Sequence, residues 1–164
     1  MSAYPASMIV REAIDDFLAR YGFSRDECSA RTYRIALFGL EFRLPNPRSR
    51  RVMVPLHDLH HIATGYEADW RGEVAIGAWE LRAGCTTAML WLINGVAAIL
   101  GLVIAPKDTW HAFRTGAEAR SLYRMNVSYA AALDLTVGEL RARIGVPQDG
   151  IARDAARLPE RTPE

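Results

Sequence analysis

The chain has 164 residues, half of them apolar, with a formal net charge of +1 and an isoelectric point near 7.9. This length predicts one domain with a buried core, and the balanced charge argues against nucleic-acid binding. Cys28 and Cys85 are too few for a disulfide scaffold, and the N-terminus lacks a secretory pattern, so we expect reduced, buried thiols in a bacterial cytoplasmic protein.

The first third of the chain predicts a helix, a second short helix and an extended segment. Apolar residues recur at helical spacing over residues 7–21, and Gly22 ends that pattern. Residues 24–27 have the form of a capping box that opens a short helix. Alternating apolar and charged residues around Gly39 predict a small β-hairpin near residues 33–44.

The middle of the chain carries two predicted helices, one after an arginine-rich stretch. We expect that stretch to be a solvated loop or a contact for anionic headgroups or a substrate carboxylate; it contains Arg48, Arg50 and Arg51. A helix over residues 55–64 would begin at a proline and end at Gly65, and another would open at Gly72.

Residues 83–106 contain no charged side chain. The run is long enough to span a bilayer, yet Asn94, two threonines and three glycines interrupt it. We expect a long central helix covered on all sides by other helices, with an interfacial helix and a membrane span as alternatives. A pocket for an isoprenoid chain would have the same composition.

The last part predicts a helix from Asp108 through Tyr123 and a closing helix over residues 135–145. From about residue 148 the chain is polar and contains prolines, which predicts a loose tail. The expected fold is therefore a mostly α single-domain helical bundle over residues 1–147 with a C-terminal tail, 148–164.

Residues 57–73 carry the pattern with the clearest chemistry. His57 and His61 are four residues apart and so lie on one face of a helix, and Glu73 follows on the next helix. Asp58, beside the first histidine, is placed to ligate a metal or to orient an imidazole. Two imidazoles with carboxylates suit zinc, and also iron or manganese, and leave a coordination position open.

Three other residues can either take part in this chemistry or serve only the fold. Glu80 lies one heptad after Glu73, so it is either a base or ligand of the site or the partner of an arginine. His60 faces away from the pair, and we expect a polar rim residue. His111 stands alone beside aromatic residues, and we expect a core or surface histidine rather than a ligand.

The motif His57-Asp58-x-x-His61, followed by eleven residues and Glu73 in a Gly-Glu pair, resembles the zinc-ligand motif of the coenzyme Q biosynthesis protein 4 family. The closing segment Glu139-Leu140-Arg141 is similar to that family's last helix, and the resemblance covers about residues 52–147. It implies a mostly helical protein at the membrane surface that works in ubiquinone biosynthesis. It also implies that His57, Asp58, His61 and Glu73 hold the metal.

The resemblance implies removal of the C1 carboxyl from a prenylated hydroxybenzoate-type precursor, which would make the protein a metal-dependent decarboxylase, a lyase. A bound metal would stabilise the developing negative charge, with Asp58 or Glu80 moving protons. The alternative is a non-catalytic protein that binds a prenyl lipid or assembles other ubiquinone-biosynthesis proteins around a structural metal. Both interpretations place the chain on the cytoplasmic side of a bacterial inner membrane, with an isoprenoid lipid as ligand; a homodimer is one option for its oligomeric state.

Overall fold

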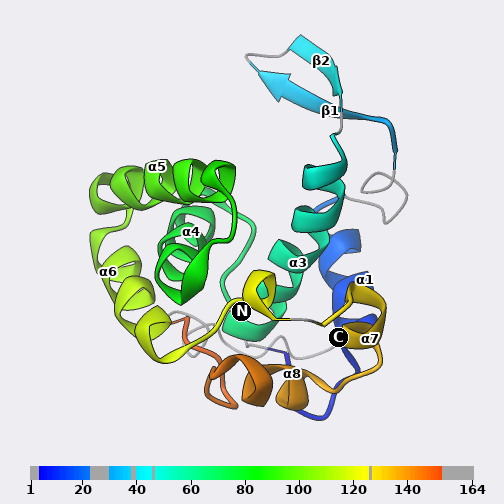
Figure 1. Ribbon diagram of the computed structural model, residues 1–164, viewed down its shortest axis with the longest axis vertical. Coiled ribbons are helices and arrows are strands. Elements are labelled where there is room, and N and C mark those ends of the chain that lie inside the picture. Colours follow the sequence, from blue (N-terminus) through cyan, green and yellow to red (C-terminus); the bar gives the residue numbers. More distant parts are fainter. Residues whose placement is uncertain (1–3, 23–29, 38–39, 46, 126, 153–164) are drawn as a thin grey trace, which may run out of the picture.

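The computed structural model describes residues 4–22, 30–37, 40–45, 47–125 and 127–152, and these form helices and one β-hairpin (Figure 1). The elements in chain order are α1 (Val10–Arg20), β1 (Thr32–Leu37), β2 (Leu40–Pro45), α3 (Arg48–Thr64), α4 (Trp70–Gly84), α5 (Ala88–Ile104), α6 (Pro106–Thr115), η1 (Gly116–Glu118), η2 (Leu122–Arg124), α7 (Tyr129–Leu133) and α8 (Val137–Ile144).

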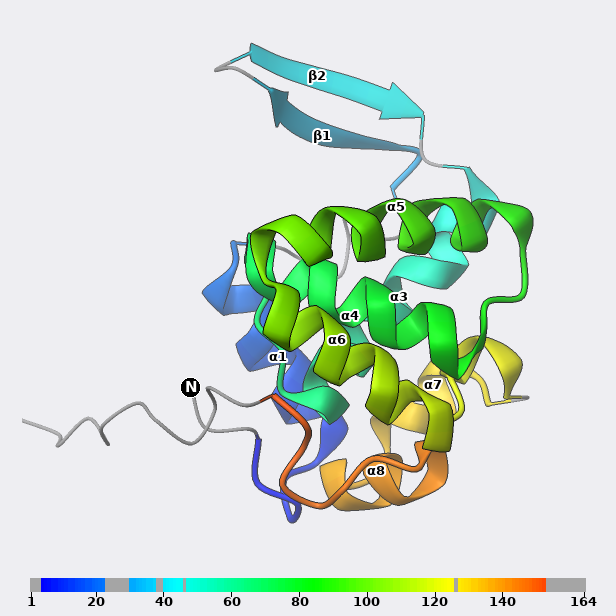
Figure 2. The same cartoon turned by 90° about the vertical axis from the view of Figure 1, so that its left-hand side faces the viewer.

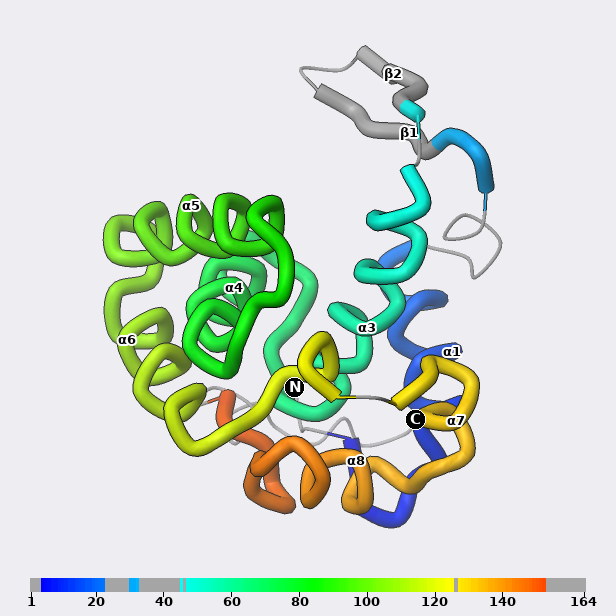
Figure 3. The backbone as a smooth tube through the Cα atoms, in the orientation of Figure 1, coloured from blue at the N-terminus to red at the C-terminus, as the bar shows by residue number. Residues whose placement is uncertain are grey.

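The helices form two groups. Helices α4, α5 and α6 pack on one another, while α3 packs with α1 and α8 (Figures 1 and 2). The first group is close-packed because glycines let the backbones approach: a Cβ on Gly77 of α4 would lie 2.7 Å from the Cβ of Ala97 on α5. The chain passes from one group to the other between α3 and α4, as the tube in Figure 3 shows.

The buried core draws on both groups. One side of α1 is fully or almost fully buried through Val10, Ala13, Ile14, Phe17 and Leu18, as the helical spacing predicts. It meets Leu59 and Ile62 of α3, Trp79 of α4, and Val137, Leu140 and Ile144 of α8 in one cluster. Burying a large aliphatic side chain contributes roughly 1.5–3 kcal/mol, so this cluster is the main favourable term in the fold.

The N-terminal elements follow the predicted order. Helix α1 lies within residues 7–21 and ends before Gly22, which has a φ of 71°. The antiparallel strands β1 and β2 lie where the hairpin is predicted, and in their register the backbone of Tyr33 pairs with that of Leu44. The short helix predicted at residues 24–27 and the thiol of Cys28 lie outside the described residues, whereas Cys85 is a buried free cysteine.

Helix α3 begins earlier than the sequence predicts, at Arg48 instead of residue 55, so the loop predicted for Arg48, Arg50 and Arg51 is wrong. Pro47 precedes the first helical residue with an extended backbone, and Pro55 lies inside the helix. A proline in the interior of the helix has no N–H to bond the carbonyl of Arg51, and the turns on both sides tolerate this loss. Gly65 ends the helix in the left-handed region, as predicted.

The apolar run does not form a central helix. Its helix, α5, lies at the surface, and its only buried residues are Leu90, Asn94 and Gly101. Leu92 is 68% exposed and Val103 is 83% exposed. At 17 residues α5 is roughly 25 Å long, shorter than the hydrocarbon layer of a bilayer. None of the described helices has the length and hydrophobicity that crossing a membrane requires.

The C-terminal third also differs in detail. The helix predicted through Tyr123 ends at Thr115 and continues as the two 3-10 turns η1 and η2, and α7 was not predicted. Helix α8 begins with the capping box of Thr136 and Glu139. The chain beyond it stays attached to the core as far as residue 152, because the backbone N–H of Ile151 donates to the carbonyl of Thr64 at 2.8 Å. Residues 153–164 lie outside the described part.

Candidate metal centre

A tight turn between α3 and α4 brings the motif residues together. The N–H of Gly65 bonds to the carbonyl of His61, and the side chain of Asp69 accepts the N–H of Gly72 to cap α4. A Cβ on Gly72 would lie 1.9 Å from the carbonyl oxygen of Glu67, so only glycine allows α4 to start this close to the turn. Glu73, in the first turn of α4, therefore faces the end of α3.

His57, His61 and Glu73 form a cluster whose donor atoms all lie within 4.8 Å of one another. The two Nε2 atoms are 3.1 Å apart. Each Nε2 lies 3.4 Å from one oxygen of Glu73, His57 from Oε2 and His61 from Oε1. The imidazole of His61 is buried, but the Glu73 side chain is 45% exposed, so the cluster is open on the side of α4.

The partners of the outer ring nitrogens determine where the protons lie. Nδ1 of His61 is 2.9 Å from the carbonyl oxygen of Tyr66, which only accepts, so Nδ1 carries the hydrogen. Nδ1 of His57 donates to the carboxylate of Glu80 at 2.8 Å. In the neutral rings, both Nε2 atoms then present lone pairs toward each other. Such a pair is stabilised when one Nε2 takes up a proton or when both bind a metal ion.

The charges around the cluster favour a cation. Burial alone would lower the pKa of His57, but the carboxylates of Glu80 and Glu73 raise that pKa well above its ordinary value. Burial alone would raise the pKa of Glu73, but hydrogen bonding to His57 and His61 holds it far below its ordinary value. The carboxylate is thus ionised at neutral pH.

Asp58 lies beside this cluster and is not one of the three residues whose donor atoms converge. Burial raises the pKa of its carboxyl to about 6, with the positive charges of His57 and His61 acting in the opposite direction. A carboxyl that titrates near neutrality can hold and release a proton under physiological conditions. The raised pKa of Asp58 and its absence from the converging set thus suit proton transfer better than metal ligation.

Glu80 lies behind His57, away from the open side of the cluster. Its carboxylate is 1% exposed and accepts hydrogen bonds from Nδ1 of His57, Nδ1 of His60 and the hydroxyl of Tyr123 on one oxygen, and from Asn94 on the other. Burial raises the pKa of Glu80, but the charge and hydrogen bonds of His57 and His60 more than offset this, so its pKa lies well below its ordinary value. Such a group stays ionised and accepts hydrogen bonds, and it does not supply a proton.

His60 is fully buried, so the prediction of a rim residue is wrong. Its Nδ1 donates to Glu80 at 2.7 Å, and its Nε2 accepts the backbone N–H of Leu122 at 2.9 Å. Its ring lies 5.0 Å from the ring of Trp79 and 5.0 Å from that of Tyr123. His60 is therefore a link between α3 and η2 within the core.

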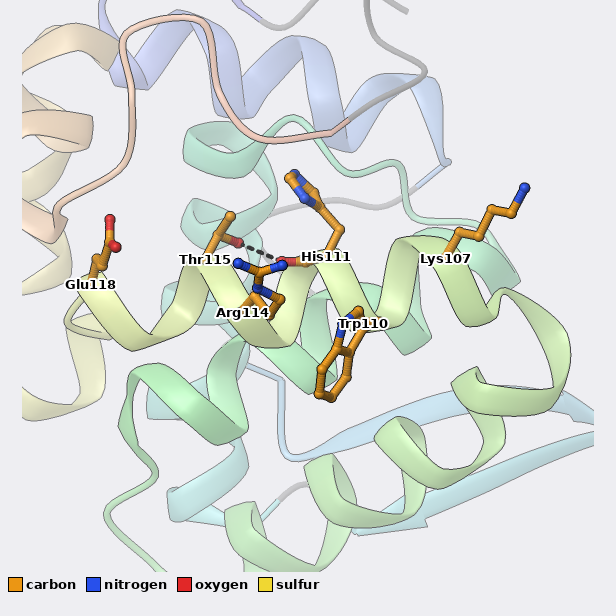
Figure 4. A pocket seen from close by; sticks show the side chains of 6 residues that line it. All are labelled: Lys107, Trp110, His111, Arg114, Thr115 and Glu118. Atoms are coloured by element: carbon orange, nitrogen blue, oxygen red, sulfur yellow. Dashed lines mark hydrogen bonds between the residues drawn. The ribbon is translucent and has the colours of Figure 1, made fainter.

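His111 is not a member of the cluster. It lies on α6 and bonds through Nε2 to the carbonyl of Ile151 at 3.0 Å. An open groove of about 380 Å³ runs along this helix, lined by Lys107, Trp110, His111, Arg114, Thr115 and Glu118 (Figure 4). Trp110 and His111 point to opposite sides of the helix in that view. The groove and the metal cluster share no residue.

Two residues of the site were not identified from the sequence. Asn94 was noted only as a polar interruption of the apolar run, and Tyr123 only as a helical residue. Both reach Glu80, at 2.9 Å each, from segments 14 and 43 residues further along the chain. The one signal in the sequence was an amide within an otherwise apolar run, since such a group requires a hydrogen-bond partner when the helix buries it.

No known family model, curated protein or solved structure matches the chain.

Proposed function

We propose that His57, His61 and Glu73 bind a divalent metal ion and that this ion serves chemistry at the open side of the cluster. The observation that carries the proposal is the pair of Nε2 atoms 3.1 Å apart, each with its other ring nitrogen committed to an acceptor. Zinc is the first choice because two imidazoles and a carboxylate are its common ligands in catalytic sites. Iron and manganese accept the same donors.

The proposed reaction is the removal of the C1 carboxyl from a prenylated hydroxybenzoate-type precursor in ubiquinone biosynthesis. The support is the HDxxH-x11-E motif and the uncharged helix that follows it. A bound divalent ion supplies Lewis-acid stabilisation of negative charge on the substrate. When the C1–carboxylate bond breaks, its electron pair stays on the ring carbon, which must then take a proton. Asp58, with a pKa of about 6, is the residue suited to deliver it.

The surface of α5 supports a membrane-resident substrate. We call its large exposed apolar residues the α5 apolar face; they are Met89, Trp91, Leu92, Ile93, Val96, Ile99, Leu100, Leu102, Val103 and Ile104. A patch of this kind marks an interaction site. The occupant we propose is an anionic membrane surface, because α6 adds the exposed Trp110 together with the cations Lys107 and Arg114, and tryptophan and basic residues favour the headgroup region.

The metal is tested by purifying the protein without chelator and measuring metal by mass spectrometry. Wild type should hold one equivalent of metal, and His57→Ala and His61→Ala should hold little. His111→Ala is the matched control, because it removes a histidine outside the cluster. Equal metal contents in all four proteins would refute the site.

The reaction is tested by adding a prenylated 4-hydroxybenzoate to metal-loaded protein and measuring released carbon dioxide. Asp58→Asn should bind metal but release far less carbon dioxide. An equimolar metal with co-purified prenyl lipid and no turnover would instead support the alternative, a lipid-binding or assembly protein with a structural metal. The raised pKa of Asp58, about 6, favours the enzyme, because it suits a group that delivers a proton.

The membrane surface is tested by sedimentation with vesicles. Vesicles containing anionic phospholipid should carry the protein down, and Leu92→Glu with Val103→Glu should abolish this. Val52→Glu on α3 is the control, since Val52 is also apolar and is 59% exposed. If vesicles bind none of the proteins and the double variant instead converts a dimer to a monomer, the α5 apolar face is an interface between two copies.

A further inference from the structure

We propose that Glu80 is a positioning residue for the metal centre, and that Asn94 and Tyr123 hold it in place. This inference rests on the proposed metal site and deepens it. Glu80 is the only one of the three that touches a residue of the cluster directly, through Nδ1 of His57 at 2.8 Å. It acts on the metal through that imidazole.

The first step is the geometry of His57. An imidazole binds a metal with one nitrogen, and the hydrogen bond at the other nitrogen fixes both the tautomer and the ring orientation. Glu80 supplies that bond from α4, one heptad after Glu73. The carboxylate therefore keeps Nδ1 protonated and leaves Nε2 free, directed at His61. Without it, His57 can rotate or exchange its proton between nitrogens.

The second step is that Glu80 is itself fixed. A buried carboxylate is tolerated only when its oxygens are hydrogen-bonded. Oε2 accepts from Asn94 of α5 at 2.9 Å, and Oε1 accepts from the hydroxyl of Tyr123 in η2 at 2.9 Å and from His60 at 2.7 Å. These donors come from three segments, so the carboxylate cannot turn away from His57 without losing bonds in the core.

The experiment measures the affinity of the full chain for zinc by competition with a chromogenic chelator, and the visible spectrum of the cobalt(II)-loaded protein. Glu80→Gln keeps the shape but removes the charge, and should weaken zinc binding roughly 10–100-fold. Tyr123→Phe removes one hydroxyl, is the milder change, and should weaken it several-fold. The cobalt spectrum should shift in both, because the orientation of His57 changes.

A double-mutant cycle separates positioning from a general structural role. In a His57→Ala background, Glu80→Gln should no longer change zinc affinity, since the imidazole through which it acts is gone. Equal zinc affinity and equal cobalt spectra for wild type, Glu80→Gln and Tyr123→Phe would overturn this inference while leaving the metal site intact. Absence of zinc binding by wild type would overturn the proposed function itself.

Should Glu80→Gln fail to fold, Asn94→Asp and Tyr123→Phe decide the matter. Asn94→Asp is nearly isosteric with the native residue but places a carboxylate where Oε2 of Glu80 needs a donor. It should weaken zinc binding at least as much as Tyr123→Phe does. Wild-type affinity in both folded variants would refute the role assigned to Glu80.

Discussion

Replacing Arg141 with methionine should destabilise the protein by about 3 kcal/mol. The guanidinium is 1% exposed and donates to four backbone carbonyls: Nε to Ala63 at 2.8 Å, Nη1 to Tyr4 at 2.9 Å and to Gln148 at 2.6 Å, and Nη2 to Ile62 at 3.4 Å. Ala63 and Ile62 belong to the last turn of α3, whose carbonyls have no partner within the helix. Arg141 thus closes the helix end that carries His61.

The magnitude follows from these bonds. Each of the three shorter bonds has a charged donor and is worth about 1.5 kcal/mol, which sums to roughly 4–5 kcal/mol. Burial lowers the pKa of Arg141, so removing the charge regains part of its desolvation cost and brings the net loss to about 3 kcal/mol. Methionine fills most of the space without supplying a donor.

The assay is urea unfolding followed by far-ultraviolet circular dichroism, with chelator present so that no metal contributes. With a slope of about 2 kcal/mol per molar, the midpoint should fall by roughly 1.5 M. Arg143→Met is the control, because Arg143 lies on the same helix but is exposed, and its midpoint should barely move. If both variants unfold at the same urea concentration, the carbonyl contacts of Arg141 do not stabilise the fold.

Three further predictions concern pH, packing and metal. In metal-free protein, Asp58→Asn should add about 1–3 kcal/mol to the free energy of unfolding above pH 6 and nothing below about pH 4. The reason is that folding raises the Asp58 pKa from 3.8 to about 6, which destabilises the folded state only when the carboxyl is ionised. An equal gain at both pH values would contradict this. Gly101→Ala should lower the free energy of unfolding in urea by roughly 1–3 kcal/mol, since its Cβ would lie 2.4 Å from Oγ1 of Thr109. A Cβ on Gly95 would meet nothing within 4 Å, so Gly95→Ala should stabilise α5. The reverse order of stabilities would refute the close packing at Gly101. Chelation of the metal-loaded protein should lower Tm by roughly 5–10 °C in calorimetry, since a ligand at 100 times its Kd contributes about 2.7 kcal/mol; His57→Ala should show no such drop.

Local patterns in the sequence predicted the elements that depend on neighbouring residues. Helix α1 has its apolar residues at helical spacing, and Gly65 and Gly145 end α3 and α8 in the left-handed region. The cluster of His57, His61 and Glu73 was also predictable, because its members lie on two consecutive helices joined by a short turn.

What the sequence could not predict depends on contacts between distant segments. His60 is buried because Trp79 and Tyr123 cover it, and neither contact is visible from spacing. The first turn of α3 carries three arginines and no apolar period, so nothing marked it as helical. The apolar run of α5 has the composition of a buried helix, and only the folded chain places it at the surface.

The position of the metal cluster between the two helix groups has a thermodynamic consequence. His57 and His61 belong to the group of α1, α3 and α8, while Glu73 belongs to the group of α4, α5 and α6. The ligands can converge only when α3 and α4 are correctly seated against each other. Metal affinity and the docking of the two groups are therefore coupled. An ion that binds only when the groups are docked stabilises the docked arrangement, and a contact that stabilises this arrangement raises the affinity for the ion.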